Sequence, residues 1–174
     1  MKTEQLIITV FAEDRPGIVR ALSDAILSHK GNWLESSLSR LCGQFAGIIH
    51  LGVPAWNKSD LVTQLENLAT EGIKVTVQST VVSVDMESEH DKNVIDIVVE
   101  ANDRAGIVEE IASVLAQAKA NVEHMETECV SASMAGYDLF RAYVEVSLPV
   151  GLEISQLEEF LEEVSDDLVV NVVM

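Results

Sequence analysis

Basic residues are scarce in this sequence. Only 11 Lys and Arg residues stand against 29 Asp and Glu residues in a chain of 174, which gives a formal net charge of −18 at pH 7. Affinity for nucleic acids comes largely from Lys and Arg side chains that displace counterions from phosphates. Anionic membrane surfaces repel an acidic protein for the same reason. We therefore expect the protein to bind neither a nucleic acid nor a membrane directly.

Cysteines and long apolar runs are also missing. The two cysteines, Cys42 and Cys129, are too few for a disulfide framework. The first eleven residues lack the cationic segment and cleavage site of a signal peptide. No apolar run approaches the roughly 20 residues that cross a bilayer. Together these absences favour a reducing compartment, and we expect a cytoplasmic protein.

Residue types that carry catalysis or hold metals are not grouped along the chain. None of the four histidines stands at metal-ligand spacing from another His or from a Cys. No nucleophile elbow, phosphate-binding loop or dinucleotide-binding glycine pattern is present. The acidic run Glu158, Glu159, Glu162 and Glu163 is typical of a solvated helix face. We expect no enzymatic activity, no metal and no cofactor.

What the sequence does contain is an internal repeat. Residues 13–32 read EDRPGIVRALSDAILSHKGN, and residues 102–121 read NDRAGIVEEIASVLAQAKAN, at a constant offset of 89. An insertion near residues 131–136 then lengthens the offset, so that residues 59–72 align with residues 155–167. The polar segment between the copies is typical of a linker. The repeat predicts one domain over residues 1–84, an acidic linker over 85–92 and a second domain over 93–174.

Each copy has the same order of predicted elements. In the first copy, a buried strand over residues 5–11 precedes a helix that begins at Pro16 and ends at Gly31. Two strands joined by a tight turn at Cys42-Gly43 follow, then a second helix and a half-buried strand near residues 74–83. The order β-α-β-β-α-β predicts an α+β fold of the ferredoxin-like type, in which an antiparallel sheet carries both helices on one face. Units this small are marginally stable alone, so we expect them to dock or dimerise.

The loop that follows the first strand of each copy has the chemistry of a ligand site. It runs into a helix N-terminus, whose free N–H groups attract an anion such as a carboxylate. Gly17 has no Cβ, so a ligand can approach the backbone closely. Asp14 can accept a hydrogen bond from an ammonium group, or it can simply cap the helix. The same alternatives apply to Asp103.

A strand, then the motif DRPGIV opening a helix, then Gly-Asn at the end of that helix, together resemble the ACT domain. The resemblance covers nearly the whole chain as two tandem copies and implies a domain that binds a small molecule, most often an amino acid. On this resemblance, Asp14 and Asn32 match polar residues that hold an amino acid ligand, and Asp103 and Asn121 are their equivalents in the second copy. The predicted ligand-binding set also contains Arg15, Gly17 and Ile18 in the first copy and Gly106 and Ile107 in the second. A further polar ligand position of the family, two residues before the motif Asp, is Ala12 here and Ala101 in the second copy.

Residues 12–56 also resemble one kind of transcriptional regulator within this family, through AEDRPGIV, SRLCGQFAGIIHL and Trp56 after a Pro-Ala step. That resemblance implies glycine as the effector and a protein partner, a LysR-type activator of transcription. The expected protein is a homodimer that does not contact DNA itself. Three alternatives stay open: a regulatory subunit acting in trans on an enzyme of amino acid metabolism, a small enzyme with an unrecognised site, and a dimerisation module without a ligand.

Overall fold

The chain folds into two compact units, Met1–Met86 and Glu87–Met174. The structure is a computed structural model that describes residues 2–80, 93–132 and 137–173. The expected linker at 85–92 and most of the expected insertion near 131–136 lie outside the described residues. We refer to the two units as domain 1 and domain 2 and describe each by itself.

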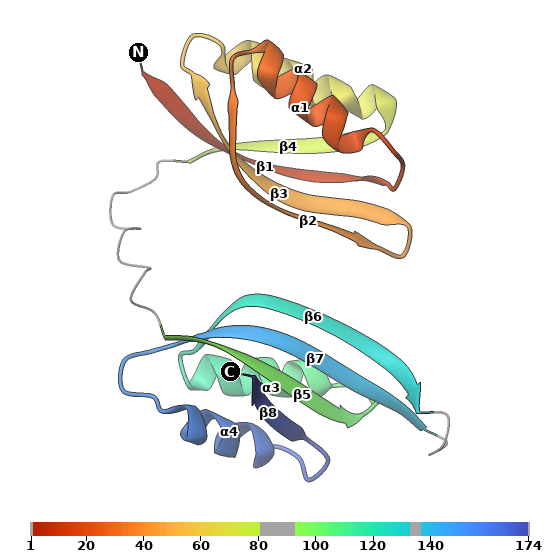
Figure 1. The fold of residues 1–174 in the computed structure, drawn as a ribbon, viewed down its shortest axis with the longest axis vertical. Coiled ribbons are helices and arrows are strands. Elements are labelled where there is room, and N and C mark those ends of the chain that lie inside the picture. The colour runs from red at the N-terminus through yellow and green to blue at the C-terminus, as the bar shows by residue number, and fades with distance from the viewer. Residues whose placement is uncertain (1, 81–92, 133–136, 174) are drawn as a thin grey trace. The chain divides into compact units, whose positions relative to one another are not determined.

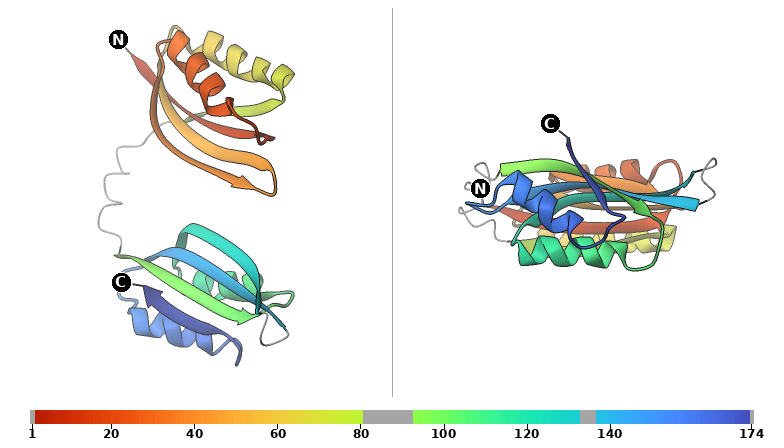
Figure 2. Two further views of the ribbon diagram at one scale, coloured as in Figure 1. Left: turned by 45° about the vertical axis from the view of Figure 1, so that its right-hand side comes forward. Right: turned by 90° about the horizontal axis from the view of Figure 1, so that it is seen from below.

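Domain 1 has the predicted β-α-β-β-α-β order (Figure 1). Its elements are β1 (Thr3–Glu13), α1 (Ile18–Ser28), β2 (Asn32–Leu41), β3 (Gln44–Pro54), α2 (Lys58–Asn67), a short 3-10 turn (Leu68–Glu71) and β4 (Ile73–Thr80). The strands form one antiparallel sheet in the order β2-β3-β1-β4. Both helices cover one face of this sheet (Figure 2).

The core of domain 1 follows from two periodicities. Alternate residues of β1, from Leu6 to Ala12, are buried against the helices, because side chains alternate across a strand. Ile18, Leu22 and Ile26 recur at helical spacing and fill the facing layer. From α2, Leu61 and Leu65 complete the cluster with no exposed surface.

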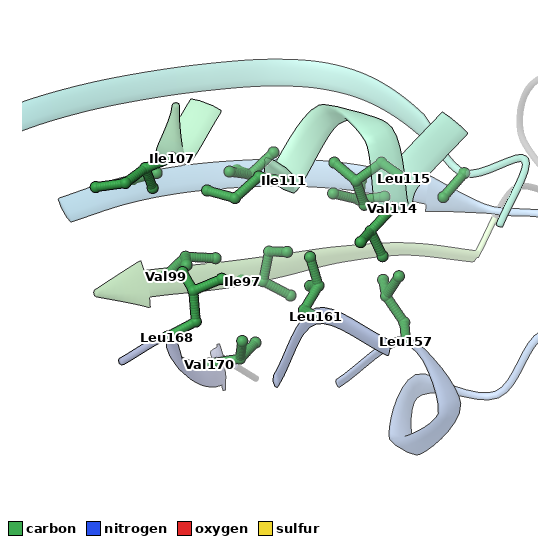
Figure 3. Close-up of a cluster of buried hydrophobic side chains, with 14 of the residues drawn as sticks. Ile97, Val99, Ile107, Ile111, Val114, Leu115, Leu157, Leu161, Leu168 and Val170 are labelled. Atoms are coloured by element: carbon green, nitrogen blue, oxygen red, sulfur yellow. The ribbon is translucent and has the colours of Figure 1, made fainter. Parts of the chain in front are cut away.

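Domain 2 repeats the architecture. Its elements are β5 (Asn93–Asn102), α3 (Ile107–Gln117), β6 (Asn121–Ala132), β7 (Tyr137–Leu148), α4 (Ile154–Glu162) and β8 (Val169–Val173), with strand order β6-β7-β5-β8. Ile107, Ile111 and Leu115 of α3 pack with Leu157 and Leu161 of α4 over the β5 side chains (Figure 3). The ferredoxin-like prediction is therefore confirmed for both domains. No helix in the described ranges is long and apolar enough to cross a membrane.

Two predicted helix boundaries differ from the structure. Helix α1 begins at Ile18, with Gly17 as its N-cap in the left-handed conformation, so Pro16 lies in the preceding turn. The helix ends at Ser28, and the residue with positive φ after it is Lys30 at 58°, not Gly31. Gly31 is needed for space, because a Cβ there would lie 2.8 Å from Cγ2 of Ile26.

The predicted turn at Cys42-Gly43 is present. It joins β2 to β3, and both residues have positive φ, 49° and 76°. Two successive left-handed residues are what a two-residue hairpin requires, since this geometry matches the twist of the strands. The hairpin brings Arg40, near the end of β2, to the end of the sheet where β1 runs into the loop before α1.

Candidate functional site

The loop between β1 and α1 lies at one end of the sheet in domain 1. The Asp14 N–H donates to the Gly43 carbonyl oxygen at 2.9 Å, which fixes the loop against the β2–β3 turn. The Ala21 N–H donates to the Gly17 carbonyl oxygen at 2.9 Å and closes the first turn of α1. The N–H groups of the residues between them come before the helical ladder and have no intrahelical acceptor. Free N–H groups of this kind attract anions, and the sequence analysis predicts a ligand's carboxylate at this place.

The Asp14 carboxylate is paired with a cation. Nε of Arg40 lies 2.8 Å from Oδ2 of Asp14, and the Asp14 side chain is 28% exposed. Among the described residues this carboxylate accepts no hydrogen bond from the first turn of α1. Asp14 therefore does not cap the helix, which was one of the two roles open from the sequence. Its charge is offset by Arg40 instead.

The corresponding loop of domain 2 differs in its charge. The residue at the position of Arg40 is Cys129, whose thiol donates to Oδ1 of Asp103 at 3.5 Å. Desolvation, together with the hydrogen bond to Asp103 and the charge of Asp138, raises the pKa of the Cys129 thiol. The thiol therefore stays protonated at neutral pH and is a poor nucleophile. Asp103 has no cationic partner among the described residues.

Arg15 and Arg104, the arginines of the two loops, form hydrogen bonds to other segments of their own domains. In domain 1, Nη2 of Arg15 donates to the Glu71 carbonyl oxygen at 2.7 Å. In domain 2, Arg104 donates to both carboxylate oxygens of Glu110, at 2.8 and 2.7 Å, and lies 3.3 Å from Oδ1 of Asp167. In both cases the arginine joins the loop to the segment that precedes the last strand. The Arg104 guanidinium is thus held by two carboxylates, whereas the Arg15 guanidinium makes one hydrogen bond to a carbonyl oxygen and keeps further N–H donors.

The remaining motif residues act through the backbone. Ile18 and Ile107 are 2% and 1% exposed and belong to the two cores, so their side chains cannot touch a ligand. Gly17 and Gly106 both have φ of 100°, and only Gly adopts this value without strain. Nothing lies within 4 Å of where a Gly17 Cβ would stand, so the backbone there is open to a small molecule.

Asn32 and Asn121 do not lie beside the loops of their own domains. Asn32 is the first residue of β2 and pairs with Gly52, while Arg40, eight residues later, lies beside Asp14. At about 3.3 Å per residue, the two ends of β2 are separated by roughly 26 Å. The structure therefore brings Asp14, Arg15 and Gly17 together but places Asn32 at the opposite end of the sheet. Asn121 has the same position at the start of β6 and donates to Oε1 of Glu123 at 2.9 Å.

The Asn32 end of domain 1 contains polar atoms that the sequence analysis missed. Gln5 of β1 lies opposite Gly52 and therefore in line with Asn32 across three strands. Oε1 of Gln5 and Nε2 of His50 are buried and have no hydrogen-bond partner among the described residues. In domain 2 the equivalent place is filled by Ser147, whose hydroxyl donates to Glu123 at 2.6 Å. The first domain thus offers unsatisfied polar groups where the second has a closed network.

Arg40 is the other residue that the sequence analysis missed. Its position in the repeat is held by Cys129, so the comparison of the two copies gave no reason to select it. Only the pairing of β2 with β3 shows that it reaches Asp14. Within the described ranges, no three His, Cys, Asp or Glu side chains are grouped as metal ligands.

Comparisons with known proteins bear on the fold of the chain. The ACT domain family model matches residues 4–78, which correspond to domain 1. The structure of an unknown protein from Galdieria sulphuraria is similar along the whole chain, with a TM-score of 0.81, 29% identity, and coverage of 99% of this chain and 100% of that one. No curated protein matches the sequence.

A second solved structure is described as a "putative glycine cleavage system transcriptional repressor". It is 18% identical, covers 99% of both chains and has a TM-score of 0.71. At this identity the likeness concerns the fold, and it extends over both domains.

Proposed function

Because this chain has the tandem ACT-like fold, with an ACT domain in residues 4–78, we propose that it is a non-enzymatic regulator that responds to an amino acid. It represses expression of the glycine cleavage genes by binding a LysR-type transcription activator rather than DNA. Similarity to the repressor structure along the full length of both chains is the observation that carries this proposal. The formal charge of −18 supports an indirect route, because an acidic surface favours a basic protein over DNA.

Glycine is the proposed effector, and domain 1 is its proposed site. The carboxylate of an amino acid would accept hydrogen bonds from the open N-terminus of α1, beside Gly17. Asp14 would repel that carboxylate if it were unpaired, but Arg40 offsets its charge at 2.8 Å. Asp103 has a thiol as its neighbour instead of a cation, so the second loop is less favourable for an anion.

The separation of Asp14 from Asn32 supports a site shared between two ACT units. One small molecule cannot reach both ends of β2, which lie roughly 26 Å apart. If both residues hold the ligand, the loop of one unit must meet the Asn32 end of another. Such a ligand favours one arrangement of units over another, which is what a regulator requires. This arrangement also accounts for the expected homodimer.

Reconstitution tests the proposal. The purified chain, the LysR-type activator and an operator fragment from the glycine cleavage genes are mixed with and without glycine, and complexes are separated on native gels. We expect the chain to bind the activator–DNA complex, not DNA alone, and millimolar glycine to release it. Asp14→Ala and Asn32→Ala should bind the activator normally and lose the response to glycine.

Two results would contradict the proposal. Salt-dependent binding of the chain to operator DNA without the activator would show that it acts on DNA directly. Co-purification with an enzyme of amino acid metabolism, together with a change in that enzyme's activity, would favour a regulatory subunit acting in trans.

A further inference from the structure

The helical layers of the two domains differ in charge. In domain 1, α1 and α2 carry two basic residues, Arg20 and Lys58, and three acidic ones. In domain 2, α3 and α4 carry no basic residue and five acidic ones: Glu109, Glu110, Glu158, Glu159 and Glu162. Glu163 follows directly after α4. Arg104 pairs with Glu110, and among the described residues no ion pair is formed by Glu109, Glu158, Glu159 or Glu162.

The acidic layer of domain 2 also contains a groove of mixed character. A depression of about 580 Å³ lies between α3 and α4. Its apolar lining residues are Val114, Ala118, Phe160 and Val164, and its polar ones are Glu109, Glu110, Ser113, Gln117 and Glu163. Phe160 is 42% exposed and Val164 is 39% exposed. A large aromatic side chain that stays partly exposed beside other apolar groups is typical of a surface that binds a protein.

The corresponding surface of domain 1 has different residues at the equivalent positions. The buried Leu61 and Leu65 of α2 correspond to Leu157 and Leu161 of α4, which places Gln64 at the position of Phe160. In domain 1 polar groups of the two helices meet here, because the Ser28 hydroxyl, which also lies 2.9 Å from the Ala25 carbonyl oxygen, is 3.4 Å from Oε1 of Gln64. Arg20 stands at the position of Glu109, and Asn67 at the position of Glu163. The repeat thus supplies a matched reference surface within the same chain.

We propose that the groove between α3 and α4 binds an amphipathic, basic helix of a partner protein. The apolar face of such a helix would cover Phe160 and Val164, and its Lys or Arg side chains would face Glu109 and Glu163. The helical layers of a second copy fit this groove poorly, because α1 and α2 carry two basic residues against three acidic ones, and the charged residues of α3 and α4 are all acidic. The inference rests on the proposed action through a protein partner and adds where that partner binds.

A defined peptide tests this surface on the full-length protein. The probe is a fluorescein-labelled 18-residue helix with Leu on one face and Lys on the other, and the reference peptide has Glu in place of each Lys. Binding is measured by fluorescence anisotropy, and the contact is located by changes in backbone amide NMR shifts. We expect the Lys peptide alone to bind and the changes to fall on α3 and α4.

Three variants separate the groove from general charge attraction. Phe160→Gln and the double variant Glu109→Arg/Glu163→Asn each install the residues of domain 1, and we expect each to weaken binding about tenfold or more. Asp24→Arg/Asp60→Asn changes the net charge of domain 1 helices by the same amount and should alter the affinity less than threefold. Equal weakening by both double variants, or shifts that fall on domain 1, would overturn the inference.

Binding of the activator to the chain and to the Phe160→Gln variant distinguishes a failure of this inference from a failure of the proposed function. If the activator binds the chain and Phe160→Gln leaves that binding intact, the groove is not the docking surface, although the proposed function stands. If the Lys peptide binds at the groove but the activator does not bind at all, the proposed function fails and the docking surface stands for another basic partner.

Discussion

At the scale of single residues, one of the contacts that differ between the two ACT-like domains lies in the β1–α1 loop and its counterpart. Asp14 is paired with Arg40, whereas Asp103 receives only the Cys129 thiol. The surrounding backbone is the same, with Gly17 and Gly106 at φ of 100°. The two loops therefore have the same backbone geometry but a different charge. Under the proposed function, we expect the loop of domain 1 to bind a zwitterionic ligand more tightly than the loop of domain 2 does.

Replacing Arg40 tests this reading. In Arg40→Met, the Asp14 charge is no longer offset and would repel the carboxylate of glycine. We expect the affinity for glycine, measured by calorimetry, to fall about tenfold or more. Lys119→Met removes the same charge from domain 2 and should leave the affinity unchanged. An Arg40 variant that binds glycine as the unaltered chain does would exclude the Asp14–Arg40 loop from the site.

At the scale of elements, small residues decide how closely strands approach. A Cβ on Gly47 would overlap the Ser37 carbonyl oxygen and the Leu38 side chain of the paired strand β2. In domain 2 the equivalent residues of β7 and β6 are Ala142 and Thr127, which pair with each other. The larger residue on one strand is thus matched by a smaller one on its neighbour. This exchange keeps the β2–β3 hairpin, which carries Arg40, in register.

A double-mutant cycle follows from this exchange. We expect Gly47→Ala to destabilise domain 1 by about 1–3 kcal/mol through overpacking, and Gly47→Ala with Leu38→Thr to recover part of that loss. Denaturant unfolding followed by tryptophan fluorescence reports domain 1 alone, because both tryptophans, Trp33 and Trp56, lie there. Simple additivity of the two substitutions would contradict the proposed fit.

The hydrogen bonds of Arg104 and Arg15 predict that they affect the pH dependence of stability differently in the two domains. Hydrogen bonds from Arg104 and Ser165 hold the pKa values of Glu110 and Asp167 below their ordinary values of 4.5 and 3.8. Both groups therefore stabilise domain 2 above those values, and this stabilisation is lost as the pH falls through the lowered pKa values. Among the described residues, the partner of the Arg15 side chain is a backbone carbonyl, which does not titrate, so this contact adds no comparable pH dependence to domain 1.

Thermal unfolding between pH 7 and pH 3 measures this difference. Both tyrosines, Tyr137 and Tyr143, lie in domain 2, and their absorbance reports it separately from the tryptophans. We expect Arg104→Met to lower the Tm of domain 2 at neutral pH and to make it less dependent on pH. Arg15→Met should leave the pH dependence of domain 1 unchanged. A domain 2 whose Tm falls equally with pH in both forms would refute the role of Arg104.

At the scale of the whole molecule, the repeat made the fold predictable. Hydrophobic periodicity predicted the strands and α-helices of the first copy, because burial on one face determines the spacing of apolar residues, and the repeat extended their order to the second copy. The 3-10 turn at Leu68–Glu71 was not predicted. The exact start of α1 was not predictable, since Pro16 and Gly17 both suit a helix entry and only the backbone angles decide between them. The residues that contact the loop residues could not be predicted from the sequence either. Arg40, Glu71 and Asp167 are distant in sequence from the loops they contact, and only the sheet register and the packed helices bring them there.

The two domains share one fold but have different proposed roles. Domain 1 has the loop proposed to bind an amino acid, and domain 2 has the helical groove with acidic and apolar lining residues. In this account a ligand bound through domain 1 changes how ACT units associate, and that change alters the binding of a protein at domain 2. The two activities should therefore be separable by mutation, with Asp14 affecting one and Phe160 the other.

The most direct test of the central claim is a thermal-shift series with each common amino acid at millimolar concentration. A ligand at about 100 times its Kd stabilises the folded state by about 2.7 kcal/mol, which raises the Tm by several degrees in a chain of this size. The account predicts a shift that is selective for glycine, appears in the tryptophan signal of domain 1 and is abolished by Asp14→Ala. No shift with any amino acid, or a glycine shift that Asp14→Ala retains in full, would contradict it.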